Sequence, residues 1–277
     1  MIGFDVKEAV TKRYSVRTYA KRPVEDEVKA DVLAYAQSLQ NPLGPKCRVQ
    51  LIEKETASNG EKLGTYGIIK GANLYLGVTT TDEPHALEAL GYEFEQLVLY
   101  AASRGLGTCW LGGTFNRSAF TEAMEIKEGE IFPILSPLGY PAQKKSVIEQ
   151  IMRKTTRADD RLSWDKLFFQ HDFSTPLSEV DAGSYAFPLE MLRLAPSAVN
   201  KQPWSVIADE TGFHFFQKHA MGGEDSGVDM HRIDMGIAIC HFHLAAMEMN
   251  LPGEFVRQSP AFEIPAGYTY ITSWIKA

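Results

Sequence analysis

The sequence contains few of the residues and strings that define several large classes of protein. Its 277 residues include three cysteines, Cys47, Cys109 and Cys240, which lie far apart and form no CxxC pair. We therefore expect neither a disulfide framework nor a zinc site. No run of about 18 apolar residues occurs, so no membrane span is expected, and the first residues lack the apolar core of a signal peptide. These absences favour a reducing cytoplasm.

Basic charge is also in deficit. The formal net charge is −7, whereas a general nucleic-acid binder needs a basic face to displace counterions. No GxSxG, HExxH, EF-hand or P-loop string is present. What is present is an ordinary globular composition with 44% hydrophobic residues, which is enough to bury one large core or two medium ones. The expected partners are small molecules.

Hydrophobic periodicity divides the chain into helices and strands. In the longest predicted helix, Leu90, Phe94 and Leu97 fall on one side, and Gly105 ends it. Residues 140–180 are basic, aromatic and poor in periodicity, and we interpret them as a crossing arm. The expected helices are 5–11, 24–39, 83–104, 117–124, 187–194 and 231–249, and the expected extended segments are 48–53, 73–80, 131–138, 204–208, 212–217 and 268–275.

The pattern of the first half starts again after about residue 184. The two long helices overlay at a constant offset of about 145 positions, and small, large and turn positions then agree together. This indicates two fused copies of one fold; the alternative is chance similarity between two helices rich in alanine and leucine. We expect a first half at 1–140, an arm at 141–183 and a second half at 184–277. The overlaid pairs are Gly91 and Gly236, Leu99 and Leu244, Ala101 and Ala246, Leu106 and Leu251, and Trp110 and Phe255.

The first string with chemical meaning is Arg13-Tyr14-Ser15-Val16-Arg17, directly after a helix. Two guanidinium groups flank a hydroxyl, and the planar fork of an arginine suits a phosphate or a flavin carbonyl. The alternative is an exposed basic helix end that complements the helix dipole.

The second string, residues 195–204, reads APSAVNKQPW. Two prolines fix its backbone, and it offers serine, asparagine and glutamine side chains before a strand. Such a rigid loop suits hydrogen bonding to a ring with alternating donors and acceptors. The alternative is a helix-to-strand turn with polar decoration.

The third string, residues 105–113, reads GLGTCWLGG. A dinucleotide-binding glycine motif lies between a strand and the start of a helix. This string follows a helix and has Trp110 at the sixth position, so that interpretation is rejected. Gly112 and Gly113 instead allow the backbone to approach a flat ligand closely.

Together the three strings resemble the nitroreductase family of flavoproteins, with supporting matches at GANLYLGV, SPLGYP and RKTTRADDRLSWDKLFF. The resemblance covers nearly the whole chain. It implies an α+β fold of two related halves, each with a small, mostly antiparallel sheet flanked by helices. It also implies FMN at the interface of an intertwined dimer, NADH or NADPH as the electron donor, and ping-pong hydride transfer to a small conjugated acceptor such as a nitroaromatic or a quinone.

The resemblance also assigns positions around the cofactor. The arginine string would hold the FMN phosphate and pyrimidine edge, and Tyr14 stands where many members have another basic residue. The glycine string would give backbone donors near the flavin N5, with Trp110 close to the ring. Arg161 matches an arginine that closes on the phosphate, and the APSAVN loop matches the one that the opposite subunit contributes. No side chain has a catalytic role, because the flavin carries the chemistry, and no metal is expected. The expected FMN-binding residues are Arg13, Tyr14, Ser15, Arg17, Trp110, Gly112, Gly113, Arg161, Pro196, Ser197, Ala198 and Asn200.

Each half lacks what the other supplies. The first half carries the arginine and glycine strings, but its residues 37–45 keep Ser38 and Asn41 and lose the first proline and the QPW ending. The second half carries the full loop but has residues 253–256 in place of the glycine string. This predicts a fused pseudo-dimer with one FMN site, as a monomer or a homodimer. The alternative function is a flavin-binding or flavin-sequestering protein without redox turnover.

Other residues have plainer interpretations. Cys109 is expected to be a core thiol, and His241 and His243 point in different directions on a helix, which argues against a metal pair. His231 is interpreted as a surface or lid residue. Residues 221–227 are either a lid over the flavin or a plain surface loop. A basic run is interpreted as a mostly solvated face, with Arg161 the exception: Lys144, Lys145, Arg153, Lys154 and Arg157.

Overall fold

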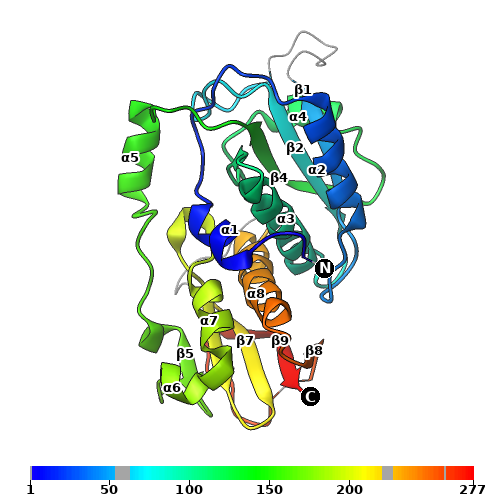
Figure 1. The fold of residues 1–277 in the computed structure, drawn as a ribbon. Helices are drawn as coiled ribbons and strands as arrows, with labels where there is room; N and C mark the ends of the chain where they lie inside the picture. Colours follow the sequence, from blue (N-terminus) through cyan, green and yellow to red (C-terminus); the bar gives the residue numbers. More distant parts are fainter. Residues whose placement is uncertain (1, 54–62, 220–226, 259) are drawn as a thin grey trace.

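Two β-sheets lie at opposite ends of the molecule, and two long helices lie between them (Figure 1). The computed structural model describes residues 2–53, 63–219, 227–258 and 260–277. The central helices are α3 (Ala86–Ser103) and α8 (Met230–Glu248), which are buried along most of their length. One hydrophobic core extends from Leu76 in the first sheet, through Phe94 and Phe242 in these helices, to Phe215 in the second sheet.

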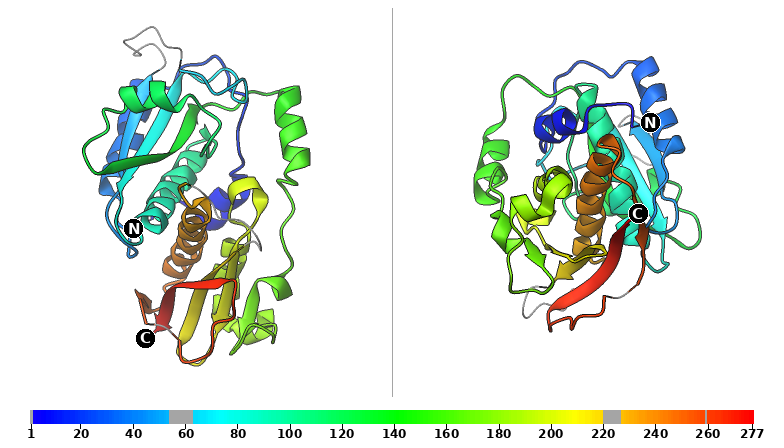
Figure 2. Two further views of the ribbon diagram at one scale, coloured as in Figure 1. Left: turned by 180° about the vertical axis from the view of Figure 1, so that it is seen from behind. Right: turned by 60° about the horizontal axis from the view of Figure 1, so that its bottom comes forward.

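The first sheet is antiparallel and has the strand order β1-β2-β4-β3. Its central strand β2 is buried on both faces: Leu74 and Leu76 pack in the central core, and Tyr75 packs in a second cluster with Phe120. Helices α2 (Asp26–Ser38) and α4 (Arg117–Ala123) lie on the opposite faces of this sheet (Figure 2). The strands are β1 (Arg48–Glu53), β2 (Leu74–Thr81), β3 (Gly107–Thr108) and β4 (Glu130–Gly139).

The second sheet has the strand order β5-β6-β7-β9-β8, with β5 parallel to β6 and the other pairs antiparallel. The predicted hairpin is confirmed, because β6 and β7 pair across a turn in which the Asp209 carboxylate accepts hydrogen bonds from the backbone N–H groups of Thr211 and Gly212 at 2.8 and 3.0 Å. The predicted α+β class, with small, mostly antiparallel sheets flanked by helices, is confirmed. The strands are β5 (Phe168–Gln170), β6 (Trp204–Ala208), β7 (Gly212–Lys218), β8 (Gly253–Val256) and β9 (Tyr268–Lys276).

Helices α3 and α8 cross in close contact at two glycines. A Cβ atom added to Gly91 would lie 2.1 Å from the Ile233 carbonyl oxygen, and one added to Gly236 would lie 2.0 Å from the Glu88 carbonyl oxygen. Both distances are far below van der Waals contact, so only glycine allows the two backbones to approach this closely. This crossing sets how the two sheets face each other and therefore shapes the space between them.

The arm between the sheets is more regular than the sequence analysis expected. It contains α5 (Val147–Thr155) and a 3₁₀ turn (Trp164–Lys166), and it ends in β5 at the edge of the second sheet. In Figures 1 and 2 it runs along the outside of the molecule from one sheet to the other. The expectation of an aperiodic arm was wrong because α5 turns its apolar residues outward: Val147 is 71% exposed and Ile151 is 58% exposed, whereas Glu149 is buried.

The remaining helices are short and surround the central pair. Among the described residues, no helix is both long and apolar enough to cross a membrane. The short helices are α1 (Val6–Lys12), α6 (Glu179–Ala182) and α7 (Ala186–Arg193), with further 3₁₀ turns at Gly183–Tyr185 and Ala198–Asn200.

Candidate functional site

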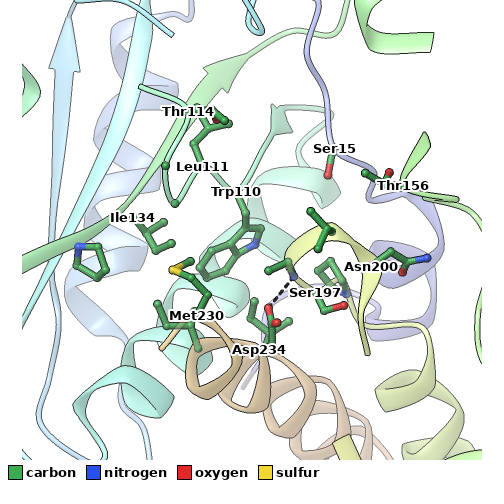
Figure 3. Close-up of a pocket in the computed structure, with 18 of the residues that line it drawn as sticks. Ser15, Trp110, Leu111, Thr114, Ile134, Thr156, Ser197, Asn200, Met230 and Asp234 are labelled. Carbon is green, nitrogen blue, oxygen red and sulfur yellow. Dashed lines mark hydrogen bonds between the residues drawn. The ribbon is translucent and has the colours of Figure 1, made fainter. Parts of the chain in front are cut away.

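A cavity of about 1090 Å³ lies beside the start of α8, between β4 of the first sheet and the loop that precedes β6. Its walls come from the end of α1, the turn after β3, the first residues of β4, the arm, and the loop between α7 and β6. Figure 3 shows Trp110 in the middle, with Ser15, Thr156 and Asn200 on one side and Ile134 and Met230 on the other. All twelve residues that the sequence predicted to bind FMN line this one cavity: Arg13, Tyr14, Ser15, Arg17, Trp110, Gly112, Gly113, Arg161, Pro196, Ser197, Ala198 and Asn200.

One end of the cavity carries buried arginines with unused hydrogen-bonding capacity. The Nε atoms of Arg13 and Arg17 are buried and have no hydrogen-bond partner among the described residues. Arg13 Nε lies 3.7 Å from Glu95 Oε1. Burial lowers the Arg13 pKa, although Glu95 partly offsets the effect. Buried donors in folded proteins are nearly always paired, so unpaired ones indicate that an acceptor is missing.

Arg161 also lines this end, and most of its N–H groups donate hydrogen bonds to other atoms of the protein. Its guanidinium donates to the carbonyl oxygens of Leu194 at 3.0 Å and Ala158 at 3.0 Å, which ties the arm to the end of α7. Burial, together with the nearby positive charge of Arg13, lowers the Arg161 pKa to about 10. The arginine end is therefore electropositive and poorly solvated. A bound anion would neutralise this positive charge and would accept hydrogen bonds in place of water.

Arg153 was misplaced by the sequence analysis. It was assigned to a solvated basic face, but its side chain is only 16% exposed, lines the cavity and pairs with Asp159. Its guanidinium carbon lies 5.5 Å from the centre of the Tyr14 ring, and Lys145 Nζ lies 4.9 Å from the same ring. Two cations therefore lie near the ring of Tyr14, which stands at the position where many family members have a basic residue. The signal was missed because α5 itself was not predicted.

The loop between α7 and β6 has a strained backbone that specific hydrogen bonds hold. Val199, Asn200 and Gln202 have positive φ angles of 45°, 59° and 51°. Residues other than glycine rarely adopt positive φ angles. Ser197 Oγ accepts a hydrogen bond from Gln202 N–H at 2.8 Å, and Gln202 Oε1 accepts one from Leu162 N–H at 2.8 Å. Strain of this kind persists where the surroundings fix it, and it is frequent at ligand sites.

Asp234 anchors the same loop from α8, and the sequence analysis did not single it out. Its Oδ1 accepts a hydrogen bond from Ala198 N–H at 2.9 Å, and its Oδ2 lies 3.0 Å from His231 Nδ1 (Figure 3 draws the first bond). Burial raises the Asp234 pKa, although the bond to His231 works against that rise. His231 therefore contributes to the support of this loop.

A buried network holds Trp110. Its indole N–H donates to Glu95 Oε2 at 2.8 Å, and Glu95 Oε1 lies 2.9 Å from His241 Nε2. His241 Nδ1 lies 2.9 Å from the Met191 carbonyl oxygen, so this nitrogen carries a proton, because a carbonyl only accepts. His241 thus serves this network, and no group of three or more metal-ligating side chains occurs in the part of the chain that the structure describes.

The turn after β3 brings bare backbone to the cavity. A Cβ atom on Gly112 would lie 2.6 Å from Met230 Cε, and one on Gly113 would meet nothing within 4 Å. The N–H groups of both glycines have no hydrogen-bond partner among the described residues. Cys109, just before this turn, is buried, and burial raises the pKa of its thiol. Residues 221–227 were interpreted as either a lid or a plain surface loop; residues 221–226 lie outside the described residues, whereas Gly227 lines the cavity.

The other end of the cavity is mainly apolar, and the sequence analysis did not find it because the first residues of β4 look like ordinary core. Ile131, Pro133 and Ile134 line it together with Met230. The arrangement fits FMN in three respects: a basic end with donors that lack hydrogen-bond partners, a turn with free amides at the middle, and an apolar end. Pockets of this kind combine an apolar lining with a few convergent polar groups.

Comparison with known proteins agrees with this arrangement. A family model for a TM nitroreductase matches residues 5–246. A nitroreductase from Thermotoga maritima has a similar structure, with a TM-score of 0.62 and 19% sequence identity over 98% of this chain and 93% of that chain. A nitroreductase family protein from Clostridium difficile has a TM-score of 0.42 and 22% identity over 55% of this chain and 92% of that one. A search of curated proteins gave no match. Since the family model spans most of its length, the chain belongs to the nitroreductase family.

Proposed function

We propose that the protein binds one FMN per chain and acts as an FMN-dependent oxidoreductase, with NADH or NADPH as donor and a small conjugated acceptor such as a nitroaromatic or a quinone. The observation that carries this proposal is the pair of buried, unpaired arginine nitrogens, on Arg13 and Arg17, at one end of a cavity with an apolar far end. Membership of the nitroreductase family supports it, and one similar solved structure is described as an FMN-dependent nitroreductase.

In this proposal the chain's residues bind, orient and shield the cofactor. Arg13, Ser15 and Arg17 hold the phosphate and the pyrimidine edge, and Arg161 closes this end with the arm. Gly113 and its neighbour give backbone donors at the ring, and the Pro196–Asn200 loop meets the ring edge. FMN, when bound, supplies the reversible two-electron chemistry, so the protein contributes position and electrostatics. A single apolar end for donor and acceptor implies that they bind in turn, which gives ping-pong kinetics.

We also propose that the two halves are related copies that form an internal pseudo-dimer. The connection β1-β2-α3-β3-α4-β4 with strand order β1-β2-β4-β3 recurs, without a counterpart of α4, as β6-β7-α8-β8-β9 with order β6-β7-β9-β8. Gly91 and Gly236, which the sequence overlay pairs, are the two contact glycines of the helix crossing. This reciprocity is what a two-fold relation between the halves requires.

The second half supports the proposal of a single FMN site per chain, because a different residue stands at the position that corresponds to Trp110. Phe255 occupies it, and its ring packs 5.0 Å from Trp274 and 5.1 Å from His243. In the first half, Asn41 corresponds to Asn200 and donates to Glu93 Oε1 at 2.6 Å. Phe255 therefore packs among other aromatic rings and Asn41 bonds to Glu93, and no further arginine nitrogen of the described residues is buried without a hydrogen-bond partner.

The test is a flavin count followed by anaerobic reduction. Reconstituted protein should hold one FMN per chain and should bleach within seconds when NADH or NADPH is added without oxygen, and a quinone or nitroaromatic should restore the colour. Two FMN per chain would contradict the single site. Yellow protein that does not bleach would favour the flavin-sequestering alternative, and a chain that cannot be loaded with FMN would contradict both functions.

Arg17→Ala should weaken FMN binding roughly ten- to hundredfold, because a hydrogen bond to a charged group contributes about 1.5–3 kcal/mol. Fluorescence quenching during FMN titration measures the Kd. Lys12→Ala is the matched control, since Lys12 is exposed, pairs with Glu8 and does not line the cavity. Equal FMN affinity in the two variants would remove the assigned role of Arg17.

A further inference from the structure

Arg117 has an unusual set of partners for an arginine on the surface. It is the first residue of α4, and its side chain turns back over the preceding turn. Nη2 donates to the Gly112 carbonyl oxygen at 2.6 Å, and Nη1 donates to the Phe132 carbonyl oxygen. The guanidinium carbon also lies 4.9 Å from the centre of the Phe115 ring. No carboxylate among the described residues forms an ion pair with Arg117, so this cation serves two backbone carbonyls.

These two bonds join the glycine turn to the first residues of β4. On the other side of the turn, Leu111 is fixed to Leu135 by two backbone hydrogen bonds of 2.9 and 3.0 Å. Among the described residues, the bond from Arg117 is the one that holds the Gly112–Gly113 peptide. Glycine on both sides of a peptide makes its rotation inexpensive, because neither residue has a Cβ to oppose it.

The orientation of this peptide decides whether its C=O group or its N–H group points into the cavity. A trans peptide is planar, and its C=O and N–H groups point in opposite directions; the described residues contain no cis peptide bond. A guanidinium that holds the Gly112 oxygen on one side therefore directs the Gly113 N–H to the other side. Gly113 lines the cavity, and its N–H has no partner among the described residues.

We propose that Arg117 is a positioning residue that locks the Gly112–Gly113 peptide so that the Gly113 N–H, and not the Gly112 carbonyl, faces the bound cofactor. The inference rests on the proposed function, because it assumes FMN in the cavity. Burial of the guanidinium lowers the Arg117 pKa, which indicates that it gives up solvation to make these bonds.

The lock has a consequence for the reduction potential. The oxidised flavin N5 accepts hydrogen bonds, and the fully reduced flavin carries a hydrogen there and donates. In the arrangement that the family resemblance implies, the Gly113 N–H would donate to N5 and would therefore favour the oxidised form. Without the lock, the peptide is free to turn its carbonyl towards the reduced form, so the midpoint potential should rise. Loss of a positive charge alone has the opposite effect, because a nearby cation stabilises the anionic reduced form. The sign of the change thus separates positioning from charge.

The experiment measures the two-electron midpoint potential of bound FMN in wild type, Arg117→Met and Arg117→Lys, with a reference dye under anaerobic conditions. Arg117→Lys keeps the charge but replaces the guanidinium with a single ammonium nitrogen, which cannot form the planar two-carbonyl bridge. Its bound FMN should favour the reduced form by roughly three- to tenfold, the size of one net hydrogen bond, which corresponds to a rise of about 15–30 mV. Arg117→Met also removes the positive charge, which opposes this rise, so its potential should rise by a smaller amount.

Melting temperatures and FMN titrations should first establish that both variants fold and bind FMN. A potential that is unchanged or lower in Arg117→Lys would overturn this inference while the proposed function stands. If the midpoint potential changes only in Arg117→Met, and decreases there, Arg117 acts through its charge. Wild-type protein that fails to bind FMN would overturn the proposed function and this inference together.

Discussion

At the scale of single residues, the site depends on side chains that do not line up in any sequence motif. Asp234 and Glu95 are buried carboxyl groups on the two central helices, and each holds a residue that faces the cavity. Asp234 fixes the backbone of Ala198, and Glu95 fixes the indole of Trp110. A buried acid is costly unless its oxygens are used, so their presence indicates that positioning of these neighbours matters.

The two roles of Asp234, hydrogen-bond acceptor and buried acid, are separable by substitution. Asp234→Asn keeps an oxygen for Ala198 N–H and should retain FMN. Asp234→Ala leaves that buried N–H unpaired, at a cost of about 1–3 kcal/mol, and should lower both stability and FMN affinity. FMN titration of both variants measures this difference, and equal FMN loss in the two would show that the bond to Ala198 is not what the loop needs.

The pH dependence follows from the raised pKa of Asp234. A carboxyl whose pKa is higher in the folded than in the unfolded chain is favoured as the neutral acid in the fold. Its contribution to stability is therefore present at low pH and is lost as the pH rises from the ordinary value of 3.8 through the folded-state pKa. Asparagine has no such loss, so the stability of Asp234→Asn relative to wild type should increase with pH over this window and then level off. Urea unfolding at several pH values measures this; a flat difference would contradict it.

At the scale of elements, the sequence predicts those whose apolar residues face the core. The helix over 83–104 and the 204–217 hairpin were predicted because burial imposes their periodicity. Helix α5 was not predicted, because its apolar residues face outward and its buried residue is Glu149, which accepts a hydrogen bond from the Thr18 hydroxyl at 2.8 Å. Hydrophobic patterns report contact with a core, and α5 has no buried apolar residue, although Leu167 and Phe168 later in the arm pack in the central core.

The same reasoning explains how much of the site the sequence contained. The twelve predicted residues that line the cavity came from three short strings and one arginine, which the resemblance to the family made recognisable. Arg153 and Asp234 act on Tyr14 and Ala198, which lie far from them in the sequence. Such pairs depend on how the helices cross and where the arm lies, and neither is encoded in local spacing. Arg117 lies only five residues from Gly112, but its role depends on the conformation of the turn between them.

The helix crossing itself is testable at Gly91. A methyl group there would lie 2.1 Å from the Ile233 carbonyl oxygen, which is backbone and cannot swing aside. Gly91→Ala should therefore destabilise the fold by about 1–3 kcal/mol or more, measured by urea unfolding without FMN. Gly113→Ala is the matched control, because a Cβ there meets nothing within 4 Å. Equal stability of the two variants would mean that the helices tolerate a wider separation.

At the scale of the whole molecule, the cavity exists only because the halves are packed together. The arginine and glycine strings come from the first half, and the 196–200 loop and Asp234 come from the second. The core is also shared, since residues from β2 to β9 belong to one cluster through α3 and α8. A chain of two related halves with separate cores would unfold in two steps, whereas a shared core couples them.

Calorimetry should therefore record one unfolding transition, with equal calorimetric and van't Hoff enthalpies. FMN binds residues of both halves in the proposed function, so it should move this entire transition upward. At a free concentration of one hundred times the Kd, the added stability is about 2.7 kcal/mol. Two transitions, of which FMN moves only one, would mean that the halves are energetically independent and that the site belongs to one of them. The FMN-free protein is the control, because the shared core alone predicts a single transition without the ligand.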